Sequence, residues 1–216
     1  MVNMKYDMAG AAVCAQTVLT AAQLKIPHEI ISVTPLTENV PDGKSYRPGD
    51  VITTSSGMTI EVVNTDAEGR MILSDALHYS GRFKPDILIL IATLTGSAKI
   101  CLGDQAAALL GNDNKVMDML QKVGDDVGER LWPLPLWDDY QDYLKSEIAD
   151  MKNMSLKGAG TITAATFLSH FMPKTSWAHI DIASTSFEEE GKSYVSKGAT
   201  GFGVRLLINY LQALCP

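Results

Sequence analysis

An uninterrupted run of apolar, β-forming residues, DILILIAT from Asp86 to Thr93, constrains the fold of this chain more than any other stretch. A strand with one face in water alternates apolar and polar side chains, whereas a continuous apolar run is typical of a strand covered on both faces. The segment just before it, Gly69–Phe83, carries apolar residues at helical spacing. Because helical and strand patterns alternate along the rest of the chain, the sequence predicts an α/β fold with a mixed, largely parallel sheet flanked by helices.

Periodicity and turn residues place the other elements. The predicted helices are Met8–Lys25, Gly69–Phe83, Lys115–Glu129, Asp138–Ile148, Gly160–Phe171 and Gly203–Leu214. The other predicted strands are His28–Leu36, a hairpin within Val51–Asn64 that turns at Ser56-Gly57, and Trp177–Ala183. The acidic stretch Phe187–Gly191 is expected to be a solvated loop. In sheets of this class, ligands bind beyond the carboxyl ends of the strands, and we expect the functional residues there.

Composition excludes several classes of function. The formal net charge is −7, and Lys and Arg never cluster beyond a pair, so the concentrated positive charge that nucleic-acid binding needs is missing. Cys14, Cys101 and Cys215 lie far apart, which argues against a disulfide framework and for a reducing compartment. The longest apolar stretch is too short and too polar to span a bilayer. The sequence therefore predicts a protein without nucleic-acid or membrane partners.

The stretch VVNTDAEGRMILSDAL, from Val62 to Leu77, carries the strongest chemical signal. It sets Asp66, Glu68 and Arg70 on alternate positions just before a helical pattern. In an extended segment, side chains two residues apart share a face, so these three would converge if the chain leaves the sheet still extended. Two adjacent carboxylates repel each other unless they share a cation, so the pattern indicates a divalent metal site.

A purely structural interpretation competes with the metal site. Thr65-Asp-Ala-Glu68 matches the capping box, in which the two outer residues satisfy the first amides of a helix. Asp7 likewise precedes a helical pattern and could serve as an ordinary N-cap. A cap does not explain Arg70, and both interpretations are open on the residues alone.

Five motifs, in order along the chain, resemble leucyl aminopeptidase, the cytosolic two-metal M17 family. They are MKYDMAGAA at Met4–Ala12, YRPGD at Tyr46–Asp50, NTDAEGR at Asn64–Arg70, ATLTG at Ala92–Gly96 and GATG at Gly198–Gly201. The resemblance covers essentially all of residues 1–216 and corresponds to the C-terminal portion of the family's catalytic domain. It implies a partial M17 domain fold and the hydrolysis of N-terminal residues, preferably Leu-like ones, from peptides.

The resemblance also assigns roles to residues. It implies that Asp7, Asp66 and Glu68 are ligands of two divalent metal ions, Mn or Zn, with Glu68 bridging them. Arg70 would hold a bicarbonate ion that acts as a proton shuttle. The residues expected to contact substrate are Met4, Asn64, Thr93, Leu94, Gly96 and Ala183. For Met4 and Ala183, plain core packing is the competing interpretation.

The resemblance implies a cytoplasmic homohexamer, but the family pattern contains more than this chain. Family members carry a Lys and an Asp that complete the metal site, and a second Lys that polarises the substrate carbonyl, upstream of MKYD. The N-terminal domain and the start of the catalytic domain are expected to be absent, so the chain alone should have little or no activity.

Two other functions compete with a peptidase. One is a non-catalytic oligomerisation or regulatory remnant that pairs with full-length subunits, which would show no dependence on metal. The other is a two-metal phosphohydrolase, which would be expected to show His ligands and a basic phosphate cradle, and neither is visible in the sequence.

Overall fold

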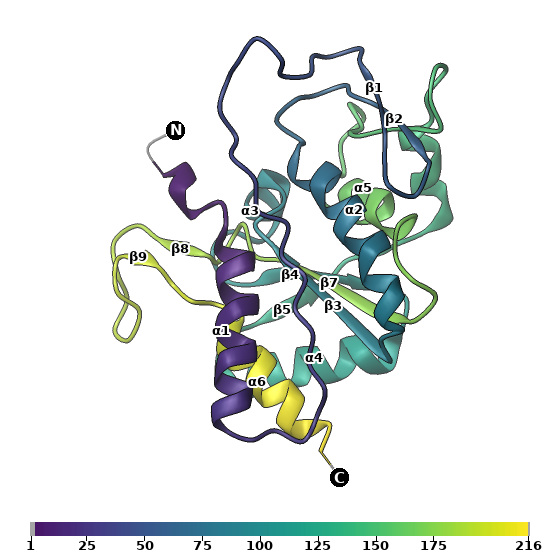
Figure 1. The fold of residues 1–216 in the computed structure, drawn as a ribbon. Helices are drawn as coiled ribbons and strands as arrows, with labels where there is room; N and C mark the ends of the chain where they lie inside the picture. The colour runs from purple at the N-terminus through teal and green to yellow at the C-terminus, as the bar shows by residue number, and fades with distance from the viewer. Residues whose placement is uncertain (1–2, 216) are drawn as a thin grey trace. The chain divides into compact units, whose positions relative to one another are not determined.

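The chain folds into two compact units in the computed structural model, which describes residues 3–215 (Figure 1). The first unit comprises the described parts of Met1–Ser32, Leu88–Leu134 and Ser176–Pro216. The second comprises Val33–Ile87 and Pro135–Thr175. Each unit is thus assembled from segments that are far apart in the sequence.

The first unit is built on a four-stranded sheet. Its strands, in spatial order, are β3 (Ile87–Ala92), β7 (Ser176–Asp181), β4 (Ala107–Gly111) and β5 (Leu131–Pro133). β4 pairs antiparallel with β7 and parallel with β5, so the sheet is mixed. The helices of this unit are η1 (Met4–Tyr6, 3-10), α1 (Ala9–Gln23), α3 (Gly96–Leu102), α4 (Asn114–Val127) and α6 (Val204–Ala213). The predicted α/β fold with a mixed sheet and flanking helices is confirmed.

Close packing explains how the helices lie on this sheet. α6, yellow in Figure 1, runs beside the purple α1 and also packs against α4. A Cβ atom at Gly10 of α1 would lie 2.4 Å from the carbonyl oxygen of Ile91 in β3, so only glycine allows α1 to approach so closely. The first four residues of β4, Ala107 to Leu110, are completely buried and form the centre of the core.

The second unit combines a small sheet with helices. Its strands are β1 (Val51–Thr53), β2 (Thr59–Glu61) and β6 (Met151–Lys152), in the order β1-β2-β6. Its helices are α2 (Gly69–Ser80), η2 (Gly81–Phe83, 3-10), η3 (Asp138–Leu144, 3-10) and α5 (Gly160–Ser169). α5 packs against α2 and η3. The predicted hairpin is confirmed as β1 and β2, with Gly57 at a φ of +88° in the turn.

Two sequence-based predictions are wrong. His28–Leu36 was expected to be a buried strand, but it forms no strand, and Leu36 is 74% exposed. β-propensity alone does not create a strand without a paired neighbour. Asp138–Ile148 was expected to be helical throughout, but within it only Asp138–Leu144 is helical, and it is a 3-10 helix. The ring of Tyr140 stacks on that of Trp137 and meets that of Tyr143 edge to face, contacts that the three-residue repeat of a 3-10 helix brings about.

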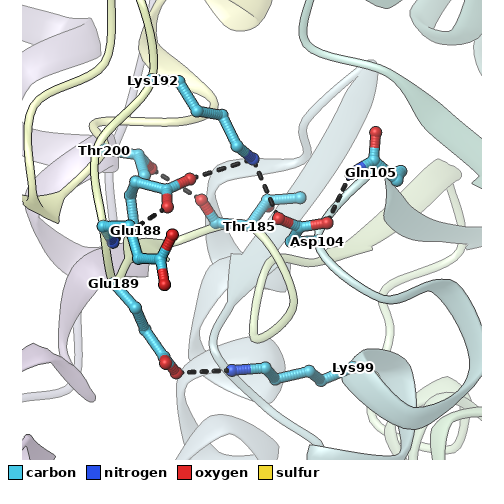
Figure 2. Close-up of polar contacts among 9 residues, drawn as sticks. Lys99, Asp104, Gln105, Thr185, Glu188, Glu189, Lys192 and Thr200 are labelled. Atoms are coloured by element: carbon cyan, nitrogen blue, oxygen red, sulfur yellow. Dashed lines mark hydrogen bonds and ion pairs between the residues drawn. The ribbon is translucent and has the colours of Figure 1, made fainter.

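The acidic stretch Phe187–Gly191 is more structured than the predicted solvated loop. It begins with β8 (Phe187–Glu188), which pairs antiparallel with β9 (Gly198–Ala199). Figure 2 shows Lys192 between the carboxylates of Asp104 and Glu188, each 2.9 Å away, and Lys99 beside Glu189 at 3.4 Å. These ion pairs attach the β8–β9 hairpin to α3 and to the loop that follows it. Among the described helices, none is long and apolar enough to cross a membrane.

Candidate functional site

The Asn64–Arg70 segment follows β2 and leads into α2, but it is not extended as the side-chain spacing had suggested. The amide of Ala67 donates to the carbonyl of Asn64 at 3.3 Å, and the amide of Asp66 donates to Asn64 Oδ1 at 2.9 Å. These bonds form a tight turn of the kind that an Asn side chain favours. Asp66 is exposed on this turn and Glu68 is half-buried, so the turn, rather than strand alternation, sets where the carboxylates lie.

The capping-box interpretation of the same residues is also wrong. Glu68 is itself the residue that precedes the first helical turn, with φ −75° and ψ −33°, and its side chain makes no capping hydrogen bond. Its backbone carbonyl accepts hydrogen bonds from the amides of Met71 and Ile72. Because α2 begins after Glu68 rather than after Thr65, the predicted capping box is not formed.

Tyr46, from the YRPGD motif, lies beside this turn. Its phenol donates a hydrogen bond of 3.4 Å to the carbonyl of Thr65. Burial and, to a smaller degree, the neighbouring negative charge of Glu68 raise the pKa of the Tyr46 phenol. Two motifs that are separate in the sequence are therefore neighbours in space within the second unit.

Arg70 lies in the first turn of α2 and is only 5% exposed. Its Nη1 donates a hydrogen bond of 2.9 Å to the backbone carbonyl of Asn153. A buried guanidinium is costly to desolvate unless it is hydrogen-bonded, and this carbonyl meets part of that need. Arg70 thus brings a fixed positive charge to the helix end that carries Asp66 and Glu68.

Asp7 belongs to the first unit, and it does not cap α1 as the structural interpretation proposed. The residue preceding that helix is Met8, with no side-chain cap. Asp7 Oδ1 instead accepts a hydrogen bond of 2.7 Å from the hydroxyl of Thr93. Met4, just before it, is 54% exposed, so the core-packing interpretation is wrong for Met4.

Asp181, which sequence reasoning missed, organises the residues around Thr93. This carboxylate is fully buried at the end of β7. Its Oδ1 accepts hydrogen bonds from the amides of Leu94 and Ala183, each at 3.1 Å, and its Oδ2 accepts one of 2.6 Å from the hydroxyl of Thr95. Leu94 and Ala183, two of the predicted substrate contacts, are therefore fixed by one buried charge, and the exposed Gly96 follows directly.

The donor chemistry of these residues suits a divalent cation. Asp66 and Glu68 supply carboxylate oxygens two residues apart in the sequence on one turn, and oxygen donors suit Mn and also bind Zn. Within residues 3–215, no group of three or more His, Cys, Asp or Glu side chains is arranged to hold a metal ion. The Asn64–Arg70 segment can therefore supply part of the ligand set of a metal ion, but not all of it.

Comparisons with known proteins place these motifs in context. Residues 1–208 match the model of the cytosol aminopeptidase family, catalytic domain. The chain belongs to this family. The family resemblance carried by the five motifs is thereby confirmed.

Relatives within the cytosol aminopeptidase family are close in sequence. The chain is 55% identical over 212 residues to a protein of Geobacter sp. (strain M21) and 53% identical over 213 residues to one of Geobacter sulfurreducens, both named "Probable cytosol aminopeptidase". These alignments cover 98% and 99% of this chain but only 43% of each relative. The chain thus spans less than half the length of these two aminopeptidase relatives.

A solved structure supports the fold. The chain superimposes on the "Bottromycin maturation enzyme BotP" with a TM-score of 0.90 and 37% sequence identity, over 96% of this chain and 47% of that one. The α/β architecture of a partial M17 catalytic domain is therefore shared with an experimentally known protein.

Proposed function

We propose that these 216 residues contribute to the active centre of a metal-dependent aminopeptidase that removes Leu-like N-terminal residues from peptides. Membership of the cytosol aminopeptidase family is the observation that carries this proposal. The exposed Asp66 on the turn before α2 supports it, because the capping box that competed for this motif is not formed.

In this proposal, Asp7, Asp66 and Glu68 are ligands of two Mn or Zn ions. Such a metal pair, when bound, polarises the scissile carbonyl and lowers the pKa of a water molecule. The tight turn at Asn64 leaves Asp66 exposed, so its side chain is open to a cation. Arg70 would bind bicarbonate through its positive charge, and the hydrogen bond from its Nη1 to the carbonyl of Asn153 would hold the guanidinium in place.

The first unit would supply most of the residues that contact the substrate. Asp181 holds the backbone at Leu94 and Ala183, and Thr93 is tied to Asp7. Met4 and Gly96, both exposed, would complete the pocket for an apolar N-terminal side chain, and the family resemblance assigns Asn64 a substrate contact as well. The first unit thereby fixes the carbonyl of Leu94 that would hold the peptide.

Localisation, oligomeric state and the activity of the chain by itself are also proposals. Family resemblance supports a cytoplasmic homohexamer in which each complete subunit holds its own metal pair. Because the resemblance assigns two further metal ligands and a lysine to sequence outside these 216 residues, we propose that the chain by itself has little or no peptidase activity.

The test is an assay of Leu-p-nitroanilide hydrolysis by the 216-residue chain with added Mn²⁺, beside a complete relative. We expect a rate at least about a hundredfold lower than that of the relative, because missing metal ligands weaken both binding and chemistry. A rate close to that of the relative would show that the inactivity proposal is wrong. Association with full-length subunits that is unaffected by metal would favour the non-catalytic alternative.

The ligand assignment is tested by Mn²⁺ titration of Asp66→Asn and Glu68→Gln, with exposed Asp118→Asn on α4 as the matched control. We expect each motif substitution to lower Mn²⁺ affinity at least about tenfold, and the control to leave it unchanged. Equal affinity in all three variants would remove these acids from the metal site.

A further inference from the structure

Asn153 is a fully buried residue directly after β6 in the second unit. β6 pairs parallel with β2, and the Asn153 amide continues this pairing by donating 2.9 Å to the carbonyl of Glu61. The sheet therefore fixes the position of residue 153 independently of the Asn64–Arg70 segment.

The side chain of Asn153 binds the backbone at the start of that segment. Oδ1 accepts hydrogen bonds from the amides of Val63 at 2.8 Å and Asn64 at 3.3 Å. Nδ2 donates to the carbonyl of Asn64 at 2.7 Å. One side-chain amide thus satisfies both polar groups of the Asn64 backbone, a task that needs an acceptor and a donor side by side.

The backbone of Asn153 binds the other end of the segment, because its carbonyl accepts the 2.9 Å hydrogen bond from Arg70 Nη1. Asn64 carries the constraint further, since its Oδ1 accepts from the amide of Asp66 at 2.9 Å. A chain of hydrogen bonds consequently runs from β6 through Asn153 and Asn64 to Asp66, and a second branch runs to Arg70.

We propose that Asn153 is the positioning residue of the Asn64–Arg70 segment, which fixes Asp66 and Arg70 relative to each other by binding the segment at both ends. Its catalytic meaning rests on the proposed function, whereas its positioning role does not. Asn153 touches neither metal nor substrate in this proposal, and it acts only through the residues that it holds.

The test uses Asn153→Asp, which has nearly the same shape but lacks the donor when ionised. A carboxylate oxygen would then face the carbonyl of Asn64 and repel it, while a protonated carboxyl group would restore the donor. Burial raises the pKa of a carboxyl group at position 153, and the guanidinium of Arg70 opposes that rise. Glu61 on β2 is an acid on the neighbouring strand, and its carboxylate accepts a hydrogen bond from the hydroxyl of Ser146.

The measurement is the hydrogen-exchange rate of the Val63, Asn64 and Asp66 amides in the full chain. At each pH between about 4.5 and 8.5, the rate in the variant is divided by the rate in the wild type. Taking the ratio cancels the pH dependence of intrinsic exchange. We expect about tenfold faster exchange in the variant at high pH and a return toward the wild-type rate as the pH falls. A ratio of one throughout, or a ratio that does not change with pH, would overturn the proposal.

Asn209→Asp is the matched control. Asn209 also donates through Nδ2 to a backbone carbonyl, that of Arg205 at 2.8 Å, but it is exposed on α6 in the first unit. The control should leave exchange at Val63, Asn64 and Asp66 unchanged. If it loosened these amides as much as Asn153→Asp does, a general loss of stability would explain the effect and the proposal would fail.

Mn²⁺ titration of the same proteins separates this inference from the proposed function. Lower Mn²⁺ affinity in Asn153→Asp at high pH, with an unchanged midpoint of urea unfolding, supports both the positioning role of Asn153 and the metal role of the segment. If Asp66→Asn and Glu68→Gln bind Mn²⁺ as the wild-type chain does while the pH-dependent exchange is seen, the positioning role stands and the metal role of the segment fails. If Mn²⁺ binds to wild type and variant alike with equal exchange, the positioning role fails and the metal role stands.

Discussion

Buried polar side chains hold backbone that is distant from them in the sequence, and Asp181 shows how much depends on one residue. Replacing it with Ala would leave the amides of Leu94 and Ala183 and the hydroxyl of Thr95 without their acceptor. We expect Asp181→Ala to lower the free energy of unfolding by about 3 kcal/mol, and Asp181→Asn, which retains one acceptor, by about 1 kcal/mol. Urea denaturation followed by circular dichroism measures both.

Exposed Asp118→Ala is the control for Asp181, and it should change the free energy of unfolding by no more than about 0.5 kcal/mol. A loss in Asp181→Ala as small as that of the control would show that its hydrogen bonds contribute little to stability.

Glu129 holds the start of α6 in a similar way. It is 3% exposed, and its carboxylate accepts from the amides of Gly203 at 3.0 Å and Leu206 at 2.9 Å, and from Arg205 Nε at 3.2 Å. A carboxylate at a helix N-terminus is stabilised both by these amides and by the helix dipole.

We expect Glu129→Ala to lower the free energy of unfolding by about 2 kcal/mol and to speed exchange of the Leu206 amide. Thermal and urea unfolding, with amide exchange by mass spectrometry, measure these effects. Glu147→Ala, an exposed glutamate in the second unit, is the control. Unchanged exchange in the first turn of α6 would rule out the capping role of Glu129.

At the scale of elements, the β8–β9 hairpin is attached to its surroundings by charge. The lysine–carboxylate pairs in Figure 2 are partly exposed, so salt screens them and their energetic contribution is small. The hairpin also contacts η1. The centroid of the Phe187 ring lies 4.6 Å from that of the Tyr6 ring, and Tyr6 directly precedes Asp7. The hairpin therefore packs against the residue that precedes the proposed metal ligand Asp7.

We expect Lys192→Gln to speed amide exchange across Phe187–Ala199, because the bridge between Asp104 and Glu188 is lost. Raising NaCl to about 1 M should have the same effect on the wild-type chain. Lys197→Gln, on the same hairpin and exposed, is the matched control. Exchange that is insensitive both to salt and to Lys192→Gln would show that the ion pairs do not hold the hairpin.

The same contact has a defined pH dependence. Hydrogen bonds from Lys192 are the largest cause of the lowered pKa values of Asp104 and Glu188, and its bonds to these carboxylates raise the pKa of Lys192. The contact is therefore present at neutral pH, is lost in acid as the two carboxyl groups protonate, and is lost in alkali as Lys192 deprotonates. We expect the amide exchange rate of the wild-type hairpin, divided by that of Lys192→Gln at the same pH, to be lowest near neutral pH. A ratio that does not change with pH would contradict this.

At the scale of the whole molecule, each unit needs segments from distant parts of the chain. The second unit joins Val33–Ile87 to Pro135–Thr175 through the pairing of β2 with β6 and the packing of α2 on α5. A peptide of residues 33–87 lacks β6 and α5, so its apolar face stays in water. We expect this peptide to be unfolded by circular dichroism; a cooperative thermal transition would show that the first segment suffices.

Local patterns predicted much of this architecture. α1, α2, α4, α5 and α6 lie where helical periodicity placed them, within a few residues at each end, because an amphipathic or Ala-rich stretch needs only its own hydrogen bonds to form a helix. The short elements α3 and β4 were missed, since seven and five residues carry too little periodicity to be distinguished from a loop.

The sequence by itself determined the family and the helical framework, since both depend on local runs of residues such as NTDAEGR and on periodicity within single segments. Only the tertiary structure decided the shape of the Asn64–Arg70 turn and the loss of the expected strand at His28–Leu36. It also revealed Asn153 and Asp181, which accept hydrogen bonds from Val63 and Leu94, 90 and 87 positions away in the sequence. The physical reason is that a buried polar group is stable only beside its partner, and folding alone brings the two together.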